Sequence, residues 1–247
     1  MVHLMARGVQ LISAVAVLSV AASALASCAM APPPEVPTFS PPALGAALPA
    51  IDIEAPDRSA DQLADWAAPL ADELRISQTA LEAYGFAAAV LAQSAPGCGV
   101  GWTTIAGIGS VESGHGTHNG ASVGPDGNVA PPIRGIALDG RPGVALIMDT
   151  DGGRLDGDAV HDRALGPTQF IPETWERWGV DANGDGVADP DSIDDAALTT
   201  ARYLCASTDT MTTAEGWSKA LFTYNMSTQY ALDVQHRANA YAAGLRP

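Results

Sequence analysis

One glutamate, Glu112, lies in the stretch SVESGHG at residues 110–116, where it could act as an acid. Ile105 and Ile108 precede it by seven and four residues, the spacing that places three side chains on one face of a helix. Gly114 follows and is expected to end that helix within a turn. The sequence therefore predicts a carboxyl group on an apolar helical face, near the C-terminal end of the helix.

Two physical effects are expected to raise the pKa of the Glu112 carboxyl group. Burial against apolar side chains disfavours the charged form, and so does the negative end of the helix dipole. A carboxyl group that stays protonated near neutral pH can serve as a general acid. The alternative is an ordinary, solvent-facing glutamate in a frayed last turn.

A second motif, ALGPTQFIPETW at residues 164–175, combines an amide, Gln169, with an aromatic ring, Phe170. The amide can hydrogen-bond to a sugar and the ring can stack on one, so the pair suits a glycan site. Pro172 is expected at the first helical position. A helix start with a packed phenylalanine is the alternative.

A third motif, TYNMSTQYA at residues 223–231, places neutral donors and acceptors at a corner between two helices. These are Tyr224, Asn225, Ser227 and Tyr230. The alternative is a capped helix junction, in which Ser227 or Thr228 is the N-cap.

The joint occurrence of the helical glutamate, G-x-x-Q-F-x-P and Y-N-x-S-x-x-Y, in this order, resembles the lytic transglycosylases of the membrane-bound B type, glycoside hydrolase family 103. The resemblance covers about residues 76–243. It implies a lysozyme-like helical fold of the goose-type or SLT kind. It also implies cleavage of the β-1,4 bond between N-acetylmuramic acid and N-acetylglucosamine in peptidoglycan.

The resemblance also implies roles for single residues. Glu112 matches the sole catalytic acid and base of the family. One position departs from the pattern, because Val160 stands where Gram-negative members have a serine, beside His161, Asp162 and Arg163. The residues that match the sugar-binding groove are Gln169, Phe170, Tyr224, Asn225 and Tyr230.

A transglycosylase needs one carboxylate, whereas an ordinary glycosidase needs two. The 6-hydroxyl group of muramic acid attacks the anomeric carbon and leaves a 1,6-anhydro product, so Glu112 could act alone. Hydrolysis as in a muramidase is the rival reaction, for which the stretch DTDGGRLDGD offers Asp149, Asp151, Asp156 and Asp158 as a second carboxylate. A non-catalytic glycan-binding module is another alternative, but a pure binder has no need of a carboxyl group on an apolar face.

The stretch DANGDGVADPDS at residues 181–192 begins like an EF-hand calcium loop. Position twelve is Ser192 rather than glutamate, so the last ligand is expected from Asp191, Asp194 or Asp195. The resembled family has a calcium loop here, and we expect a weak structural Ca²⁺ site and no organic cofactor. A pair of tight turns followed by Asp194 as a helix N-cap is the alternative. The expected ligands are Asp181, Asn183, Asp185, the Val187 carbonyl, Asp189 and Asp191.

The elements that must position these residues are mainly helical. Apolar side chains recur every three or four residues from residue 59 onward, and no alternating run is long enough for a large sheet. We expect one mainly α domain over residues 59–247, with long functional loops. The expected helices, after a first helical stretch near residues 63–70, are 80–94, 102–113, 172–178, 195–205, 214–224 and 228–243.

The N-terminal segment predicts export. Residues 1–27 have a basic start and an apolar stretch, followed by Cys28 in the sequence LASC, which resembles a lipobox. A cleaved signal peptide with an incidental cysteine and a transmembrane anchor are the alternatives. Residues 28–58 are rich in Pro and Ala and are expected to form an extended tether from the membrane to the domain.

Two cysteines, Cys98 and Cys205, remain after Cys28, and in an exported chain they predict a disulfide. Two free thiols are the alternative. The 247 residues carry a formal net charge of −16, which disfavours nucleic acid as a partner. We expect a monomer that acts on peptidoglycan strands outside the cell membrane.

Overall fold

The computed structural model describes residues 37–247. The expected signal peptide at 1–27, the expected lipidation site Cys28 and the first part of the expected tether lie outside the described residues. No helix within residues 37–247 is both long and apolar enough to cross a membrane.

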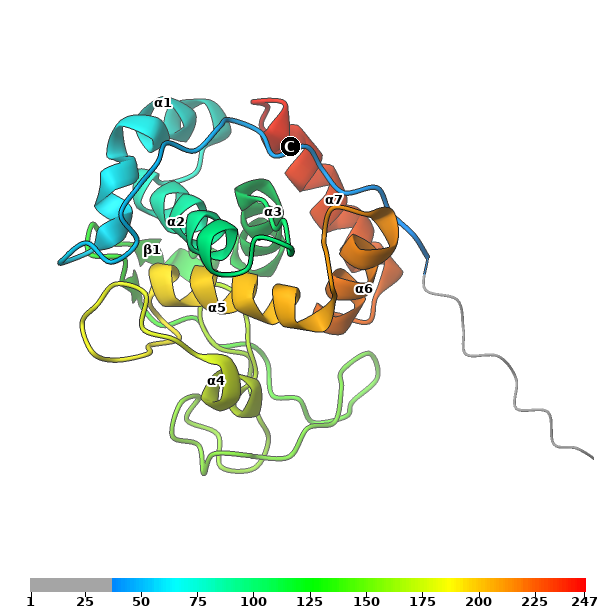
Figure 1. Ribbon diagram of the computed structural model, residues 1–247. Coiled ribbons are helices and arrows are strands. Elements are labelled where there is room, and N and C mark those ends of the chain that lie inside the picture. The colour runs from blue at the N-terminus through cyan, green and yellow to red at the C-terminus, as the bar shows by residue number, and fades with distance from the viewer. Residues whose placement is uncertain (1–36) are drawn as a thin grey trace, which may run out of the picture. The chain divides into compact units, whose positions relative to one another are not determined.

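The described chain folds into helices joined by long loops, which confirms the mainly α class (Figure 1). Two strands of two residues each, β1 (Ser122–Val123) and β2 (Val129–Ala130), form a short antiparallel ladder in which Ser122 pairs with Ala130. Short 3₁₀ turns occupy Ser59–Leu63 and His118–Gly120. The helices are α1 (Ala64–Leu74), α2 (Gln78–Ser94), α3 (Trp102–Ser113), α4 (Pro172–Trp178), α5 (Ile193–Ser207), α6 (Ala214–Tyr224) and α7 (Thr228–Ala242).

Several helices begin where a hydroxyl side chain caps them. Ser77 accepts a hydrogen bond from the Ala80 amide at the start of α2, and Ser227 caps α7, as one of the two candidates at that corner. The cap of α5 is Ser192 and not Asp194, the N-cap named in the alternative to the calcium loop. The helix starts two residues earlier than predicted, because Ser192 accepts the hydrogen bond from the Asp195 amide.

The core is built around α2 and α3, which lie in the middle of the helical layer between α1, α5 and α7 (Figure 1). Trp102, Ile105 and Ile108 of α3 are fully buried. Gly109 of α3 is in close contact with the Tyr84 hydroxyl group, so any side chain there would collide with α2. This close packing holds α3 against α2, and Ser113 at the C-terminal end of α3 donates a hydrogen bond to the Pro167 carbonyl of a long loop.

The segment 37–58 does not extend away from the domain as the predicted tether would. It has no regular secondary structure, as expected, but it lies along the helices from α6 and α7 toward α1 (Figure 1). Phe39 stacks on Phe222 with ring centroids 6.4 Å apart, and the Trp102 indole donates a hydrogen bond to the Ala46 carbonyl. Apolar side chains of the segment, including Leu48 and Ile51, pack against the core, and burying them favours the docked position.

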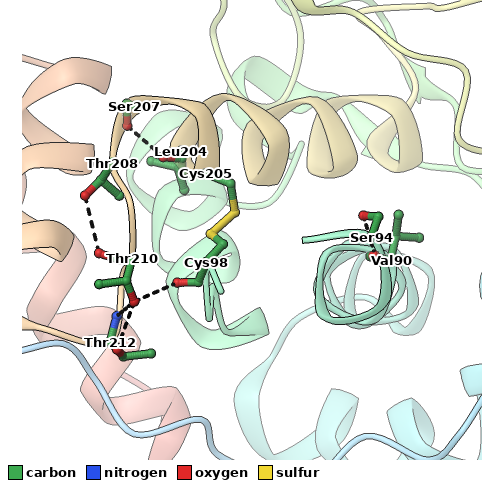
Figure 2. The surroundings of a disulfide bond; sticks show 9 residues. All are labelled: Val90, Ser94, Cys98, Leu204, Cys205, Ser207, Thr208, Thr210 and Thr212. Atoms are coloured by element: carbon green, nitrogen blue, oxygen red, sulfur yellow. Dashed lines mark hydrogen bonds between the residues drawn. A yellow bond between two sulfur atoms is a disulfide. The ribbon is translucent and has the colours of Figure 1, made fainter. Parts of the chain in front are cut away.

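The predicted disulfide between Cys98 and Cys205 is present and joins the α2–α3 loop to the last turns of α5 (Figure 2). The two Cα atoms are 5.5 Å apart and the residues are separated by 107 positions. The Cys98 carbonyl also accepts a hydrogen bond from the Met211 amide, which fastens the α5–α6 loop to the same point. A bridge that closes a loop of this length contributes about 4–5 kcal/mol in the chain-entropy account.

Arg58, at the end of the docked segment, forms a buried ion-pair cluster with α2 and α5. Its guanidinium donates two hydrogen bonds to Asp194, at 2.8 and 2.9 Å, and another to Glu82. The Asp194 side chain is fully buried and that of Glu82 is 6% exposed. One cation therefore keeps two buried carboxylates satisfied.

We expect Arg58→Ala to lower the free energy of unfolding by about 3–5 kcal/mol, because it leaves both carboxylates buried without a partner. The measurement is urea denaturation at neutral pH. Arg154→Ala is the matched control, since the pair of Arg154 with Glu176 is exposed and should contribute about 1 kcal/mol or less. Equal losses in the two variants would contradict the role of the buried cluster.

Candidate active site

Glu112 lies in the last turn of α3, which continues through Ser113 and ends at Gly114 in the left-handed conformation with φ 60°. The glutamate side chain is half-buried, and Ile108 and Ile105, which precede it by about one and two turns of the helix, are fully buried. The helix is regular at this point, so the alternative of a solvent-facing glutamate in a frayed turn does not apply.

The surroundings of Glu112 keep its carboxyl group protonated at higher pH than usual. Burial raises the pKa from 4.5 to about 7, while a hydrogen bond from the Tyr230 hydroxyl group acts in the opposite direction. The Tyr230 oxygen lies 2.7 Å from Oε1 of Glu112. Among the ion pairs formed by residues 37–247, none involves Glu112. The carboxyl group is therefore poised to exchange a proton near neutral pH.

The corner between α6 and α7 supplies two tyrosines to this site. The rings of Tyr224 and Tyr230 are stacked, with an interplanar angle of 8° and centroids 6.2 Å apart. Tyr224 donates a hydrogen bond from its hydroxyl group to the Thr168 carbonyl at 2.6 Å. Asn225 is exposed beside them at the end of α6. Tyr230 was predicted as part of the sugar groove, and its direct bond to Glu112 is an additional role.

In the turn at residues 164–171, the Gln169 side chain is more exposed than that of Phe170. Gln169 is half-buried, and its amide donates a 2.8 Å hydrogen bond to the Gly166 carbonyl. Phe170 is only 5% exposed and packs against Trp175, Tyr203 and Tyr224. The phenylalanine ring is therefore mostly packed against other aromatic rings, as in the packed-phenylalanine alternative. The Gln169 side chain remains accessible.

A groove of about 460 Å³ runs past this turn and brings four of the five predicted groove residues together. Glu112 and Tyr230 lie beyond its lining, connected to it through the stacked Tyr224. Sequence reasoning missed Tyr203, because its position on α5 carries no local motif. The groove is lined by Gln169, Phe170, Tyr224 and Asn225, together with Ala145, Ile147, Ile171, Thr174, Tyr203, Thr223 and Met226.

The aspartate-rich stretch does not contribute a second carboxylate to this groove, whose lining within the described chain contains no Asp or Glu. Asp149 and Asp151 instead gather with Asp162, with carboxylate atoms within 4.8 Å of one another. Asp156 and Asp158 accept hydrogen bonds from nearby backbone amides, including that of Arg163. Val160, at the position that departs from the family pattern, is 58% exposed.

The loop between α4 and α5 is held by hydrogen bonds from its own backbone amides to its aspartate side chains. Asp181 accepts hydrogen bonds from the Gly184 and Gly186 amides, and Asp185 accepts one from the Val187 amide. Carboxylate, amide and carbonyl oxygens are the donors that Ca²⁺ prefers, so the residue types of this loop match the ion, while the group of acidic side chains that the described residues bring closest together is Asp149, Asp151 and Asp162. Asp189 accepts a hydrogen bond from the Asp191 amide.

The three candidates for the last calcium ligand of this loop differ in their hydrogen-bond partners. Asp191 forms a bidentate pair with Arg134, at 2.7 and 2.8 Å, and Asp194 pairs with Arg58. Asp195 is fully buried and accepts hydrogen bonds from the Ala182 and Asp189 amides of the loop. Of the three candidates, Asp195 is the one without an arginine partner among the described residues.

Part of the chain matches a known family. Residues 163–219 match the model of the Transglycosylase SLT domain, a span that includes Gln169 and the loop before α5 but not Glu112. No curated protein matches the sequence.

Two solved structures resemble the chain at low sequence identity. The Escherichia coli lytic transglycosylase Slt35 in complex with bulgecin A is 16% identical, covers 75% of this chain and 83% of its own, and has a TM-score of 0.43. SltB3 from Pseudomonas aeruginosa, in complex with NAG-anhNAM-pentapeptide, is 18% identical, covers 73% of this chain and 68% of its own, and has a TM-score of 0.37. Identity and TM-score are both low, so the chemistry of the site rests on its own geometry.

The raised pKa of Glu112 predicts a stability change with pH. The folded pKa lies above the usual 4.5, so between pH 4.5 and about 7 the native state keeps a proton that the unfolded chain has lost. Stability that the protonated group provides is therefore lost as pH rises through this window. We expect Glu112→Gln to be more stable than the wild type at pH 8 by about 1–3 kcal/mol, and to differ less at pH 4.5.

The measurement is denaturant unfolding of both proteins from pH 4.5 to 8. Glu73→Gln is the matched control, because Glu73 also lies in the last turn of a helix, α1, but is exposed. A stability difference that does not change with pH would show that Glu112 has an ordinary pKa.

Proposed function

We propose that this protein is a lytic transglycosylase that cleaves the β-1,4 bond between N-acetylmuramic acid and N-acetylglucosamine in peptidoglycan. The observation that carries the proposal is the half-buried Glu112, with its pKa raised to about 7, hydrogen-bonded to Tyr230, whose ring stacks on Tyr224 of the groove. The match of residues 163–219 to the Transglycosylase SLT domain supports it.

The reaction uses one carboxyl group twice. Protonated Glu112 gives its proton to the glycosidic oxygen as the bond from the anomeric carbon breaks, and N-acetylglucosamine leaves. The resulting carboxylate then takes the proton of the muramic acid 6-hydroxyl group, whose oxygen bonds to the anomeric carbon. The product is the 1,6-anhydro sugar, and Glu112 is protonated again.

Tyr230 has a specific part in this cycle. A hydrogen bond donated to a carboxylate stabilises its charged form and lowers its pKa, so Tyr230 opposes the effect of burial. Burial alone would favour the acid and weaken the return step, in which the carboxylate acts as a base. The opposed effects keep the pKa of Glu112 near neutral, where both protonation states are accessible.

The groove suits a neutral glycan. Gln169 and Asn225 offer amides for the hydroxyl and acetamido groups of sugars, and Tyr224 and Tyr203 offer aromatic faces. Phe170 supports Tyr224 and Tyr203 from below. The groove therefore combines hydrogen bonding with stacking, the pattern expected for polysaccharide binding.

We expect Glu112→Gln to lose peptidoglycan cleavage by a factor of about 10³ or more, because the isosteric amide cannot transfer the proton. Glycan binding, followed by tyrosine and tryptophan fluorescence, should persist. Mass spectrometry of wild-type digests should find 1,6-anhydromuramic acid ends. Reducing ends would instead identify a muramidase, binding without cleavage by the wild type would identify a glycan-binding module, and an active Glu112→Gln variant would remove the proposed acid.

We also propose a structural Ca²⁺ site in the loop before α5. The ligands would be Asp181, Asn183, Asp185, the Val187 carbonyl and Asp195, with Asp189 through water. Burial raises the pKa of Asp195 to about 7, and the nearby negative charge of Asp181 adds to the effect. A cation would compensate these carboxylates and hold the loop against α5, without a part in the proton transfer.

Millimolar Ca²⁺ is expected to raise the melting temperature by only about 2–4 °C relative to EDTA, since a site without a glutamate at position twelve should bind weakly, with Kd on the order of 10⁻⁴–10⁻³ M. The doubly substituted Asp181→Ala, Asp185→Ala protein should lose this shift. Asp151→Ala, in the separate aspartate group with Asp149 and Asp162, is the control and should retain it. An unchanged wild-type melting curve would argue against the site.

We further propose that the protein is exported and anchored to the cell membrane by a lipid on Cys28. The support is the apolar N-terminal sequence that ends in LASC and the disulfide between Cys98 and Cys205, a bond typical of exported proteins. In this location the groove would face the cell wall.

A further inference from the structure

Gln169 has a backbone conformation that its own residue type disfavours. Its φ angle is 53°, in the left-handed region that residues other than glycine rarely occupy. Within the turn, its side chain bonds only to the Gly166 carbonyl, at 2.8 Å. A conformation of this kind persists when neighbouring groups hold it in place, and such positions concentrate at functional sites.

Two hydroxyl groups hold this turn through consecutive carbonyl groups. Ser113 donates a hydrogen bond to the Pro167 carbonyl, with 2.6 Å between the oxygens, and Tyr224 donates one of the same length to the Thr168 carbonyl. Ser113 also accepts a hydrogen bond from the Gly116 amide at 2.8 Å. Ser113 is 3% exposed, so water cannot readily replace these bonds.

Ser113 also connects the loop turn to the helix that carries Glu112. Ser113 directly follows Glu112, so one buried hydroxyl group joins the helical turn that carries the acid to the loop turn that carries Gln169. We infer that Ser113 is a positioning residue, which sets the placement of Gln169 relative to Glu112 across the glycan. This inference rests on the proposed function, because it assigns glycan binding to Gln169.

Ser113 acts on substrate binding and not on proton transfer. Without the hydroxyl group, the Pro167 carbonyl and the Gly116 amide lose a partner, and the turn can relax away from the left-handed conformation of Gln169. Glu112 keeps its bond from Tyr230, which comes from α7 and not from the turn. Loss of the Ser113 hydroxyl group should therefore raise KM and leave the pH dependence of kcat unchanged.

The experiment compares Ser113→Ala with Ser218→Ala on soluble peptidoglycan fragments. Ser218 is the matched control: it is fully buried, donates to the Ala214 carbonyl and accepts from the Phe39 amide, both at 2.6 Å, and within residues 37–247 it has no hydrogen bond to Glu112 or Gln169. We expect KM to rise about 10-fold in Ser113→Ala only. Ser113→Thr, which keeps a hydroxyl group, should restore most of the affinity. Equal KM values for the two alanine variants, or a shifted pH profile of kcat for Ser113→Ala, would overturn the inference.

A double-mutant cycle with Gln169→Ala tests the route of the effect. If Ser113 acts through Gln169, Ser113→Ala should add little to the KM of Gln169→Ala, whereas independent effects would multiply and contradict the inference. If Ser113→Ala does not fold, Ser113→Cys takes its place, and its weaker donor should give an intermediate KM.

The same comparison can be made without turnover. In the Glu112→Gln background, the Kd of a glycan fragment should rise with Ser113→Ala and not with Ser218→Ala. A wild-type protein that binds glycan without cutting it would refute the proposed reaction but leave this test intact. Unchanged binding in a cleaving enzyme would refute only the role of Ser113.

Discussion

The hydrogen bond between Tyr230 and Glu112 is the interaction on which the proposed chemistry depends. Its oxygens are 2.7 Å apart, and it joins the end of α3 to the start of α7, across 118 residues of sequence. Burial raises the pKa of the carboxyl group and this bond lowers it, so the two effects together set the value near neutral pH. The position of α7 against α3 therefore influences the pKa of Glu112 through this bond.

That position is secured by the packing around α3. Gly109 permits the close approach of the Tyr84 hydroxyl group from α2, and Gly107 permits that of the Val234 carbonyl from α7. His115, just past the end of α3, lies between the hydroxyl groups of Tyr84 and Tyr241, at 3.1 and 2.9 Å. Burial lowers the pKa of His115 to about 3, so this residue stays neutral and adds no charge near the acid. The end of α3 is thus fixed to both neighbouring helices through the neutral His115, and Arg237 of α7 adds a 3.0 Å hydrogen bond to Ser110 of α3.

The long loops are held by polar contacts rather than by a second large core. Carbonyl groups of the 164–171 turn accept hydroxyl donors from α3 and α6, and Arg134 bonds to Asp191 and to the Leu155 carbonyl. Apolar packing in this region consists of a small cluster around Leu165, Phe170 and Trp175, and of Val129 and Ile133, which join the main core. Loops fastened in this way can line a groove with accessible polar groups, which a larger apolar core would exclude.

Local signals in the sequence were sufficient to predict the helices, the end of α3 at Gly114, the pairing of Cys98 with Cys205 and the placement of Glu112 on an apolar helical face. These features depend on residues within a few positions or, for the cysteines, on simple counting. Only the tertiary structure decided which groups meet across long separations. In the folded protein Phe170 is buried and residues 37–58 lie against the helices. Asp191 pairs with Arg134, and Asp194 pairs with Arg58. Helix periodicity identifies the face that is buried, but the partner on that face depends on how distant segments pack, and local spacing carries no record of this packing.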